Sequence, residues 1–203
     1  EKLVERWALL SGDDDIYVAS ISDNEEDWVC AHYILETITQ AGRKGKHIYV
    51  EAIGWDEDRQ LFVDAEGAPI KNLFKLYPWE WMMREEFGHY IARSKTRFIE
   101  PLWKSVMSCK GLLAILWELY PNHPNLLEAY FEPRHLQSYA KKPLYSREGA
   151  NVQLVRNGQL IAEDDGPYGG EGFIYQALCT LPEFAGRYPV IGAWVVGDQA
   201  AGM

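Results

Sequence analysis

The sequence lacks the features that mark membrane proteins and nucleic-acid-binding proteins. Its longest apolar runs, Gly111–Trp117 and Tyr188–Gly197, are far shorter than the roughly 20 residues that cross a bilayer. It is poor in basic residues, since 20 Lys and Arg stand against 30 Asp and Glu and the net charge is −10. A nucleic-acid-binding surface needs a basic face that neutralises phosphates. We therefore expect neither a membrane span nor a nucleic-acid partner.

Cysteine is also scarce, and its spacing excludes two further kinds of protein. Cys30, Cys109 and Cys179 are far apart and form no CxxC pair or Cys/His cluster, so neither a disulfide framework nor a zinc site is expected. Each lies in an apolar stretch, which favours a buried and reduced thiol. No signal peptide is visible at the start of the chain. We expect a cytoplasmic protein.

The chain also lacks several familiar catalytic signatures. Its five His are scattered without the spacing of metal ligands, so the residues indicate no metal site of their own. The GxSxG elbow is absent, and nothing suggests Ser/His/Asp catalysis. The Walker sequence is absent too.

The residues that are present indicate a globular protein. The 203 residues are 47% hydrophobic and 25% charged, which fits one domain, or one domain with a small lobe. Eight Trp, twelve Tyr and seven Phe make the chain rich in aromatic residues. Core packing is the simplest reason and a ligand cleft the second. A carbohydrate platform is a weaker alternative, because many aromatic residues fall inside the expected strands and helices.

The N-terminal part of the chain predicts a βαβ unit. Ile16–Ile21 is a β-branched run typical of a buried strand, and His47–Ile53 resembles it. Between them we expect a helix at about Glu25–Ala41, capped by Ser22 or Asp23. One face of this helix is apolar, comprising Trp28, Ala31, Ile34, Leu35, Ile38 and Ala41. The unit implies two parallel strands joined by a right-handed crossover.

The remaining pattern predicts further helices and antiparallel strands. A hairpin over Leu61–Ile70, extended by Asn72–Tyr77, is followed by a helix at about Trp79–Ala92. A very apolar helix is expected at about Lys110–Leu119. The Asn157-Gly158 pair between alternating residues is typical of a hairpin turn. Other strands are predicted at Tyr139–Pro143, Val152–Val155, Phe173–Leu178 and Val190–Val196. The fold class is therefore α+β, with an α/β unit first.

A basic turn is a candidate anion site. The segment KKPLYSREGANV begins with Lys141 and Lys142 and continues into a loop with Ser146, Arg147 and Gly149. Glycine permits close backbone approach to an anion, and hydroxyl, N–H and guanidinium groups donate to phosphate oxygens. A basic turn is also common as plain surface, so both interpretations stay open.

Two other groups of charged residues allow a structural and a functional interpretation. Lys110 opens the most apolar helix, where it either extends its ammonium to solvent or meets a ligand. Asp23, Glu25 and Glu26 stand between a strand and a helix. They either complement the helix dipole or bind a cationic amine at the strand end.

Six blocks of the sequence closely resemble the glutathionylspermidine synthase-like ATP-grasp proteins. The blocks are LFKLYPWEWM (73–82), EPLWK (100–104), KGLLAILWELYPNHPNLL (110–127), KKPLYSREGANV (141–152), GPYGGEGFIYQAL (166–178) and YPVIGAWVVGDQAAGM (188–203). The resemblance implies that ATP phosphorylates a carboxylate and that an amine then attacks the acyl phosphate to form an amide. It further implies a pre-ATP-grasp βαβ lobe at residues 1–70 and nucleotide-binding ATP-grasp lobes at residues 71–203, truncated at the C-terminus.

The resemblance also assigns candidate site residues. It places Lys110 and Lys142 near the ATP phosphates and Arg147 in a loop that covers these phosphates. Arg147 and Lys142 are the two candidate catalytic residues. The hinge that meets adenine falls on Gln176, Ala177 and Leu178, and the carboxylates on the polyamine side fall on Asp23, Glu25 and Glu26. Positive charge at these positions suits phosphoryl transfer. Lys141 should point to the opposite face of its strand.

Two departures from the family pattern limit what this chain is expected to do. Leu76 replaces a threonine of the true glutathionylspermidine synthases, so the chain looks closer to an uncharacterised bacterial branch. The family's magnesium ligands lie before the position of Glu1, and a further phosphate arginine lies after Met203. We expect an internal piece of a longer ligase with small-molecule substrates, the Mg²⁺ ligands outside it and no activity alone. The alternative is a non-catalytic module that binds a peptide or polyamine.

Overall fold

The computed structural model describes residues 1–203 and divides them into two compact units. Unit 1 comprises Glu1–Trp103 and Ile191–Met203, and unit 2 comprises Lys104–Val190. This division differs from the boundary expected after residue 70, because strands beyond that point belong to the same sheet as the first strand. No helix in either unit is long and apolar enough to span a membrane.

Unit 1 is built on a parallel sheet. Its strands are β1 (Ile16–Ser20), β2 (Gly45–Tyr49), β6 (Asn72–Lys75) and β7 (Arg97–Ile99), in the order β2-β1-β6-β7. All three neighbouring pairs are parallel, which confirms the expected parallel pair. The segment Asn72–Tyr77 was expected to extend the preceding hairpin. Its residues Asn72–Lys75 instead form β6, which pairs with β1.

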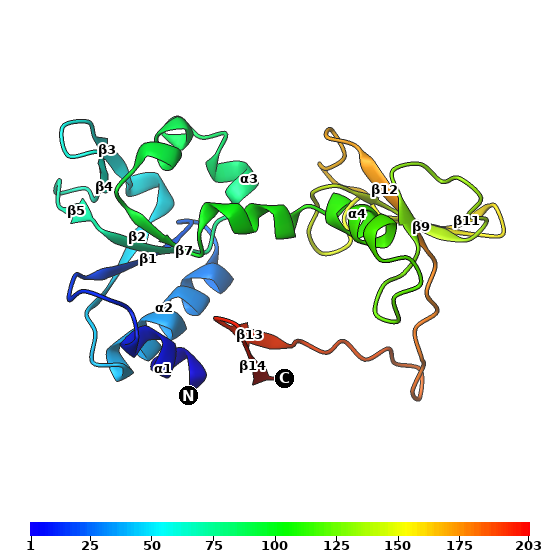
Figure 1. Ribbon diagram of the computed structural model, residues 1–203, viewed down its shortest axis with the longest axis horizontal. Helices are drawn as coiled ribbons and strands as arrows, with labels where there is room; N and C mark the ends of the chain where they lie inside the picture. The colour runs from blue at the N-terminus through cyan, green and yellow to red at the C-terminus, as the bar shows by residue number, and fades with distance from the viewer. The chain divides into compact units, whose positions relative to one another are not determined.

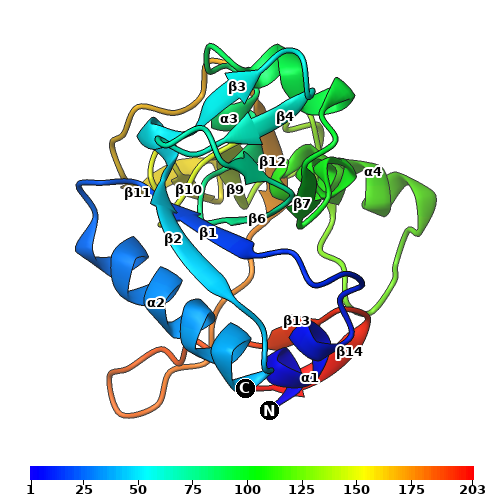
Figure 2. The ribbon, with the colours of Figure 1, turned by 90° about the vertical axis from the view of Figure 1, so that its left-hand side faces the viewer.

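Two helices cover one face of the parallel sheet. Helix α2 (Glu25–Gln40) runs along β1 and β2, and α1 (Lys2–Ala8) packs beside it (Figure 2). The core between them consists of Trp7, Ile16, Val18, Ala31, Ile34 and Ile38. Trp28, expected on the buried face of the helix, is exposed. It lies in the first turn of α2.

The ends of α2 follow from local chemistry. Asn24, rather than Ser22 or Asp23, caps the helix, since its Oδ1 accepts the backbone N–H of Asp27 at 3.0 Å. At the other end Gly42 adopts φ +72°, and the N–H of Arg43 donates to the carbonyl of Ile38. This left-handed termination explains why the helix stops before Gly42.

The other face of the parallel sheet carries a small antiparallel sheet and short helical turns (Figure 1). The small sheet contains β3 (Gly54–Asp56), β4 (Leu61–Val63) and β5 (Pro69–Ile70), and the turns are η1 (Val50–Ala52), α3 (Trp79–Met82) and η2 (Gly88–Arg93). The core on this side consists of Tyr17, Ala19, Ile48, Ile53, Phe62, Ile70, Leu73, Trp79, Met82 and Ile91. The β4–β5 hairpin confirms the expected turn at Glu66-Gly67.

The long helix expected at Trp79–Ala92 is wrong. Only α3 is α-helical, and the chain then folds back so closely that a Cβ at Gly88 would lie 2.5 Å from the carbonyl oxygen of Met83. A helix cannot continue through this reversal, and a residue with a side chain would not fit there. Likewise β2 ends at Tyr49, four residues before the expected end of that strand.

Unit 2 is a five-stranded antiparallel sheet with one helix packed on it. Its strands are β8 (Ala129–Tyr130), β9 (Tyr139–Pro143), β10 (Gln153–Arg156), β11 (Gln159–Glu163) and β12 (Phe173–Ala177), in the order β11-β10-β9-β12-β8. Helix α4 (Gly111–Leu119) packs on β8 and β12 around Ala114, Ala129 and Ile174. The hairpin at Asn157-Gly158 is confirmed, with positive φ at both residues. A 3₁₀ segment, η3 (Leu102–Ser108), follows β7.

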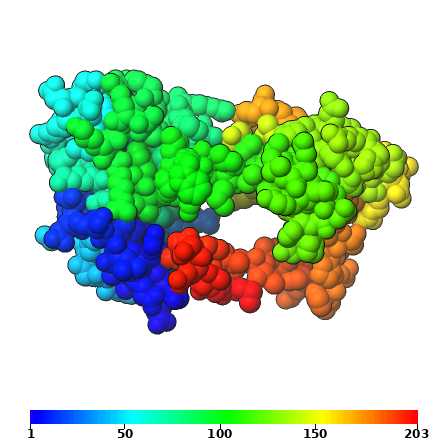
Figure 3. All heavy atoms as spheres, viewed as in Figure 1, coloured from blue at the N-terminus to red at the C-terminus, as the bar shows by residue number.

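The C-terminal residues form a hairpin that belongs to unit 1. Its strands are β13 (Trp194–Val196) and β14 (Gln199–Gly202). Their atoms lie against those of the N-terminal residues (Figure 3). The strand expected at Val190–Val196 is therefore shorter, and β14 was not expected.

The three cysteines are free, but the expected burial is wrong for two of them. Cys30 and Cys179 are exposed, and Cys109 is half-buried. Cys30 lies on α2 next to the fully buried Ala31, and the helical repeat of 3.6 residues turns it to the outer face. Its apolar neighbours in sequence therefore say little about its own burial.

Candidate functional site

The acidic candidates lie at the carboxyl edge of the parallel sheet. From β1 the chain goes to β2 on one side, whereas β6 lies on the other side of β1. Ligands of α/β proteins gather at such a reversal of strand order. Asp23, Glu25 and Glu26 are exposed there and line an open depression together with Asn24, Val29 and Cys30.

Their geometry leaves both interpretations of the acids open. Glu25 and Glu26 occupy the first turn of α2, where negative charge complements the helix dipole. No lysine or arginine forms a salt bridge with Asp23, Glu25 or Glu26, so a cationic ligand would not have to displace one. The depression is wide and exposed, which suits a polar ligand that keeps part of its hydration.

A buried lysine at the same edge was missed by the sequence reasoning. The side chain of Lys75, at the end of β6, is 3% exposed, and its Nζ donates to the carbonyl of Tyr77 at 2.9 Å. Nζ also lies 3.9 Å from Glu100 Oε1 and 4.0 Å from the centre of the Trp79 ring. Burial lowers the pKa of Lys75 to about 8, although Glu100 and Glu80 oppose the shift. A lone lysine in the apolar segment NLFKL was the available signal.

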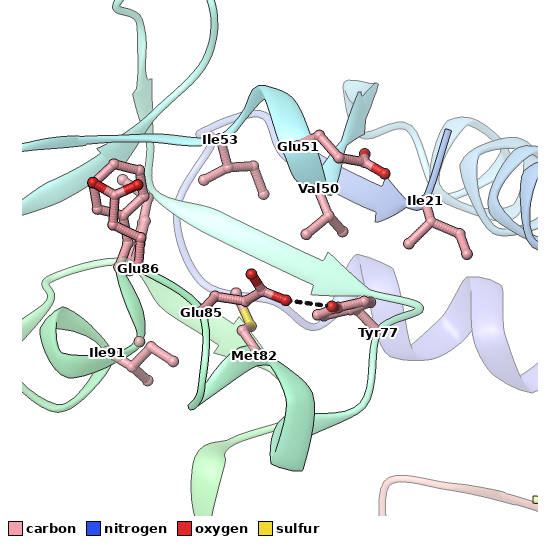
Figure 4. A pocket seen from close by; sticks show the side chains of 12 residues that line it. Ile21, Val50, Glu51, Ile53, Tyr77, Met82, Glu85, Glu86 and Ile91 are labelled. Carbon is pink, nitrogen blue, oxygen red and sulfur yellow. Dashed lines mark hydrogen bonds between the residues drawn. The ribbon is translucent and has the colours of Figure 1, made fainter. Parts of the chain in front are cut away.

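A partly open cavity of about 220 Å³ lies beside this edge (Figure 4). Its lining residues are Ile21, Val50, Glu51, Ile53, Phe62, Tyr77, Met82, Glu85, Glu86, Phe87, Gly88 and Ile91. Tyr77 Oη donates to Glu85 Oε1 at 2.6 Å. Burial, that hydrogen bond and the charge of Glu51 raise the pKa of Tyr77 to about 12. The sequence reasoning named none of these residues as a site.

The basic candidates lie in unit 2, at the start of α4, on β9 and in the turn after β9. Lys142 Nζ donates to Gln176 Oε1 of β12 at 2.7 Å, and burial lowers the pKa of Lys142. Lys110 Nζ donates to the carbonyl and to the hydroxyl of Ser146, at 2.9 and 3.0 Å. Lys110 does not extend to open solvent, therefore, but reaches into the basic turn.

Arg147 and Gly149 complete this turn. Arg147 Nη1 donates to the carbonyl of Ser146 at 3.4 Å, so two cationic groups meet at one backbone oxygen. Gly149 adopts φ +83°, and no atom lies within 4 Å of the place where its Cβ would be. The structure thus brings Lys110, Ser146 and Arg147 together and leaves open space at Gly149.

Lys141 and Lys142 lie on opposite faces of the strand. Lys141 Nζ is 4.2 Å from the centre of the Phe173 ring, whereas Lys142 contacts Gln176. Phe173 and Gln176 are three positions apart on β12 and therefore face opposite ways. Lys142 shares its face with the buried Ile174, which packs against α4.

The backbone donors expected at an adenine hinge are used within the sheet. The N–H of Ala177 donates to the carbonyl of Glu128 at 2.7 Å, and that of Leu178 to the carbonyl of Ser138 at 3.1 Å. A purine at this position would need other donors. For metals, no group of three or more His, Cys, Asp or Glu side chains is arranged to hold an ion.

Comparisons with known proteins place this geometry in context. A family model described as "Glutathionylspermidine synthase preATP-grasp" matches residues 1–203. A "Putative acid--amine ligase" of Haemophilus influenzae is 44% identical over the whole chain, which covers 55% of that relative. A "Trypanothione synthetase" of Crithidia fasciculata is 29% identical over 90% of the chain and 32% of its own length. A "Bifunctional glutathionylspermidine synthetase/amidase" of Escherichia coli is 28% identical, over 92% of the chain and 34% of its own length. The chain thus spans between a third and about half of these curated relatives.

Proposed function

Because the chain belongs to the glutathionylspermidine synthase pre-ATP-grasp family, whose curated relatives are ligases, we propose that it is part of an ATP-dependent carbon–nitrogen ligase. The whole enzyme would join a peptide-like carboxylate to an amine through an acyl phosphate, in an ATP-grasp fold. The observation that carries the proposal is that Lys110 and Arg147 both donate to the carbonyl of Ser146. This turn directly follows β9, which carries the half-buried Lys142.

The basic turn fits a polyphosphate. ATP, when bound, supplies the phosphoryl group that activates the carboxylate. Lys110, Lys142 and Arg147 would hold its phosphates, because fixed positive charge lowers the cost of charge that develops in phosphoryl transfer. Ser146 and the backbone near Gly149 would add hydrogen-bond donors. We assign no magnesium ligand to this chain and propose that these ligands lie in the rest of the enzyme.

The remaining candidates would bind the other parts of the substrates. Gln176 would face the nucleotide beside Ala177 and Leu178. The adenine would be bound by donors other than the backbone N–H groups of Ala177 and Leu178, because these two are used in the sheet. Asp23, Glu25 and Glu26 would attract the amine, because their carboxylates form an unneutralised group at the carboxyl edge of the sheet.

The two neighbouring lysines of β9 provide a matched test. Lys142→Met should weaken the binding of a non-hydrolysable ATP analogue about tenfold or more, since a charge-assisted hydrogen bond is worth roughly 1.5–3 kcal/mol. Lys141→Met, on the opposite face, should change the dissociation constant less than about twofold. Calorimetric titration of both variants measures this difference. Equal affinities in the two variants would remove Lys142 from the site.

A second experiment concerns the activity of the chain. We expect the 203-residue chain to form no amide, because we propose that the magnesium ligands lie outside it. The measurement is ATP-dependent phosphate release with glutathione and spermidine as substrates, with a full-length ligase of the family as positive control. Turnover by the isolated chain would contradict the proposal.

The second candidate function is a non-catalytic module that binds a peptide or a polyamine. The exposed and unpaired carboxylates of Asp23, Glu25 and Glu26 favour it, because they need no nucleotide to attract a cation. Titration with spermidine and separately with Mg-ATP distinguishes the two functions. Spermidine binding that Glu25→Gln reduces, without any Mg-ATP binding, would support the module and weigh against the ligase.

A further inference from the structure

The cavity beside β6 combines an apolar floor with an acidic rim. Ile53, Phe62, Met82 and Ile91 are buried, whereas the three lining carboxylates, Glu51, Glu85 and Glu86, belong to exposed residues. A site of this kind receives a ligand with an apolar body and one polar end. The apolar floor excludes a ligand that keeps its full hydration shell. The charge of the rim determines whether the bound ligand is a cation or an anion.

The charges at the rim select a cation. No Lys, Arg or His lines the cavity, and none of the three carboxylates forms a salt bridge. Glu51 Oε1 accepts the backbone N–H and the hydroxyl of Ser22, both at 3.2 Å, and Glu85 Oε1 accepts the Tyr77 hydroxyl. Each of these two carboxylates therefore keeps its second oxygen for a ligand. An ammonium group, with three donors and no acceptor, matches them, whereas an anion would be repelled.

The position and the size of the cavity fit a small organic ligand. Ile21 follows β1, Val50 and Glu51 follow β2, and Tyr77 follows β6, so the cavity opens at the carboxyl edge of parallel strands. Its volume of about 220 Å³ exceeds the ~150 Å³ of an apolar cavity known to take benzene. An apolar body of about six to eight heavy atoms would fit.

We propose that this cavity binds a primary alkylammonium ion, with the ammonium group at the acidic rim of Glu51, Glu85 and Glu86 and the apolar chain on the floor formed by Ile53, Phe62, Met82 and Ile91. Its residues differ from those proposed above for nucleotide and amine. Binding here does not require the ligase reaction, so the proposal stands or falls without it. The cavity discriminates against diamines of similar length, because a second ammonium on the apolar floor would lose its hydration without a partner.

The test is calorimetric titration of the 203-residue chain at pH 7 and low salt with three probes of equal length. Hexylammonium should bind at least about tenfold more tightly than 1-hexanol, which lacks the charge, and than 1,6-diaminohexane, which adds a second one. Shortening the chain from hexyl to propyl should weaken binding about fourfold for each CH₂ removed. Equal binding of hexylammonium and 1-hexanol, or no binding of hexylammonium, would overturn the proposal.

Matched variants locate the site. Glu85→Gln should weaken hexylammonium binding about tenfold and leave 1-hexanol binding unchanged, because the amide can still accept the Tyr77 hydroxyl but carries no charge. Glu51→Gln provides a second, independent variant should Glu85→Gln fail to fold. Glu36→Gln, an exposed residue on α2 away from the cavity, is the control and should change the affinity less than twofold. Unchanged hexylammonium affinity in both cavity variants would overturn the proposal.

Discussion

Lys75 shows how one buried side chain makes the stability of the protein depend on pH. Its ammonium is surrounded by the Tyr77 carbonyl, the Trp79 ring and the more distant Glu100 carboxylate. These neighbours do not fully replace water, and the pKa of Lys75 falls to about 8. In the unfolded chain the pKa returns to its ordinary value of about 10.4.

The sign of the pH effect follows from proton binding. Between about pH 8 and pH 10 the unfolded chain holds a proton on Lys75 that the folded chain has lost, so this residue makes the free energy of unfolding rise with pH. Lys75→Met should remove this contribution and flatten the profile. Urea unfolding midpoints at pH 7.5, 8.5 and 9.5 measure it.

The control for this experiment is Lys71→Met. Lys71 is an exposed lysine directly before β6, and it forms a salt bridge with Asp14. The substitution should leave the slope as in the parent protein. Identical slopes for Lys75→Met and the parent protein would show that Lys75 is not the group responsible.

Among single residues, sequence reasoning recognised charges in unusual positions but not their surroundings. Lys110 was recognised because it opens an apolar helix, and the structure directs it to Ser146. The burial of Lys75 does not follow from the sequence, because successive side chains of a strand point to opposite faces. The alternation alone does not tell whether the face that carries the lysine is exposed or covered. The ring of Trp79, in the short helix α3 that follows the strand, lies 4.0 Å from the Lys75 ammonium and helps to bury it.

At the scale of elements, α2 illustrates an element that local sequence specifies well. Its cap, its glycine termination and its buried face all lie within about twenty residues. The expected helix was therefore confirmed to within one residue at its C-terminus. The expected helix at Trp79–Ala92 was wrong, because a close chain reversal at Gly88 ends it.

Two residues of α2 test this description. Ile38 is 0% exposed, and Ile38→Ala should lower the free energy of unfolding by about 2–5 kcal/mol, because it removes packed atoms and leaves a cavity. Val29 is 54% exposed on the same helix, and Val29→Ala should change the free energy of unfolding by less than about 0.5 kcal/mol. Urea unfolding of both variants gives the comparison. Similar losses would mean that α2 does not pack as described.

At the scale of the whole molecule, the two units differ in how much apolar surface they bury. Unit 1 has a core on each face of its sheet, whereas the packed core cluster of unit 2 contains just three buried residues, Ala114, Ala129 and Ile174. Local opening is easier where few apolar contacts are lost. Unit 2, which carries the basic turn, should therefore open more readily than the parallel sheet.

Amide hydrogen exchange tests this difference. Amides of β9 and β12 should exchange faster than those of β1 and β6. Ile174→Ala should accelerate exchange further in β8, β9 and β12 and leave β1 unchanged, because Ile174 packs only within unit 2. Uniform acceleration across both units would contradict the description of two separate cores.

The sequence by itself determined the features that depend on near neighbours. These include the βαβ unit, the Asn157-Gly158 hairpin and the basic turn with Arg147 and Gly149. Periodicity, caps and turn chemistry act within a few residues, so a linear pattern carries them. The family resemblance added the ligase expectation, which the comparisons with curated relatives support at the level of the family.

Only the tertiary structure decided which distant residues meet. Lys142 pairs with Gln176, 34 positions away, and the acidic rim of the cavity joins Glu51 to Glu85. Burial, the lowered pKa of Lys75 and the apolar floor all come from segments that pack across the sheet. Desolvation depends on all the atoms around a group, and most of those atoms belong to residues far away in the sequence.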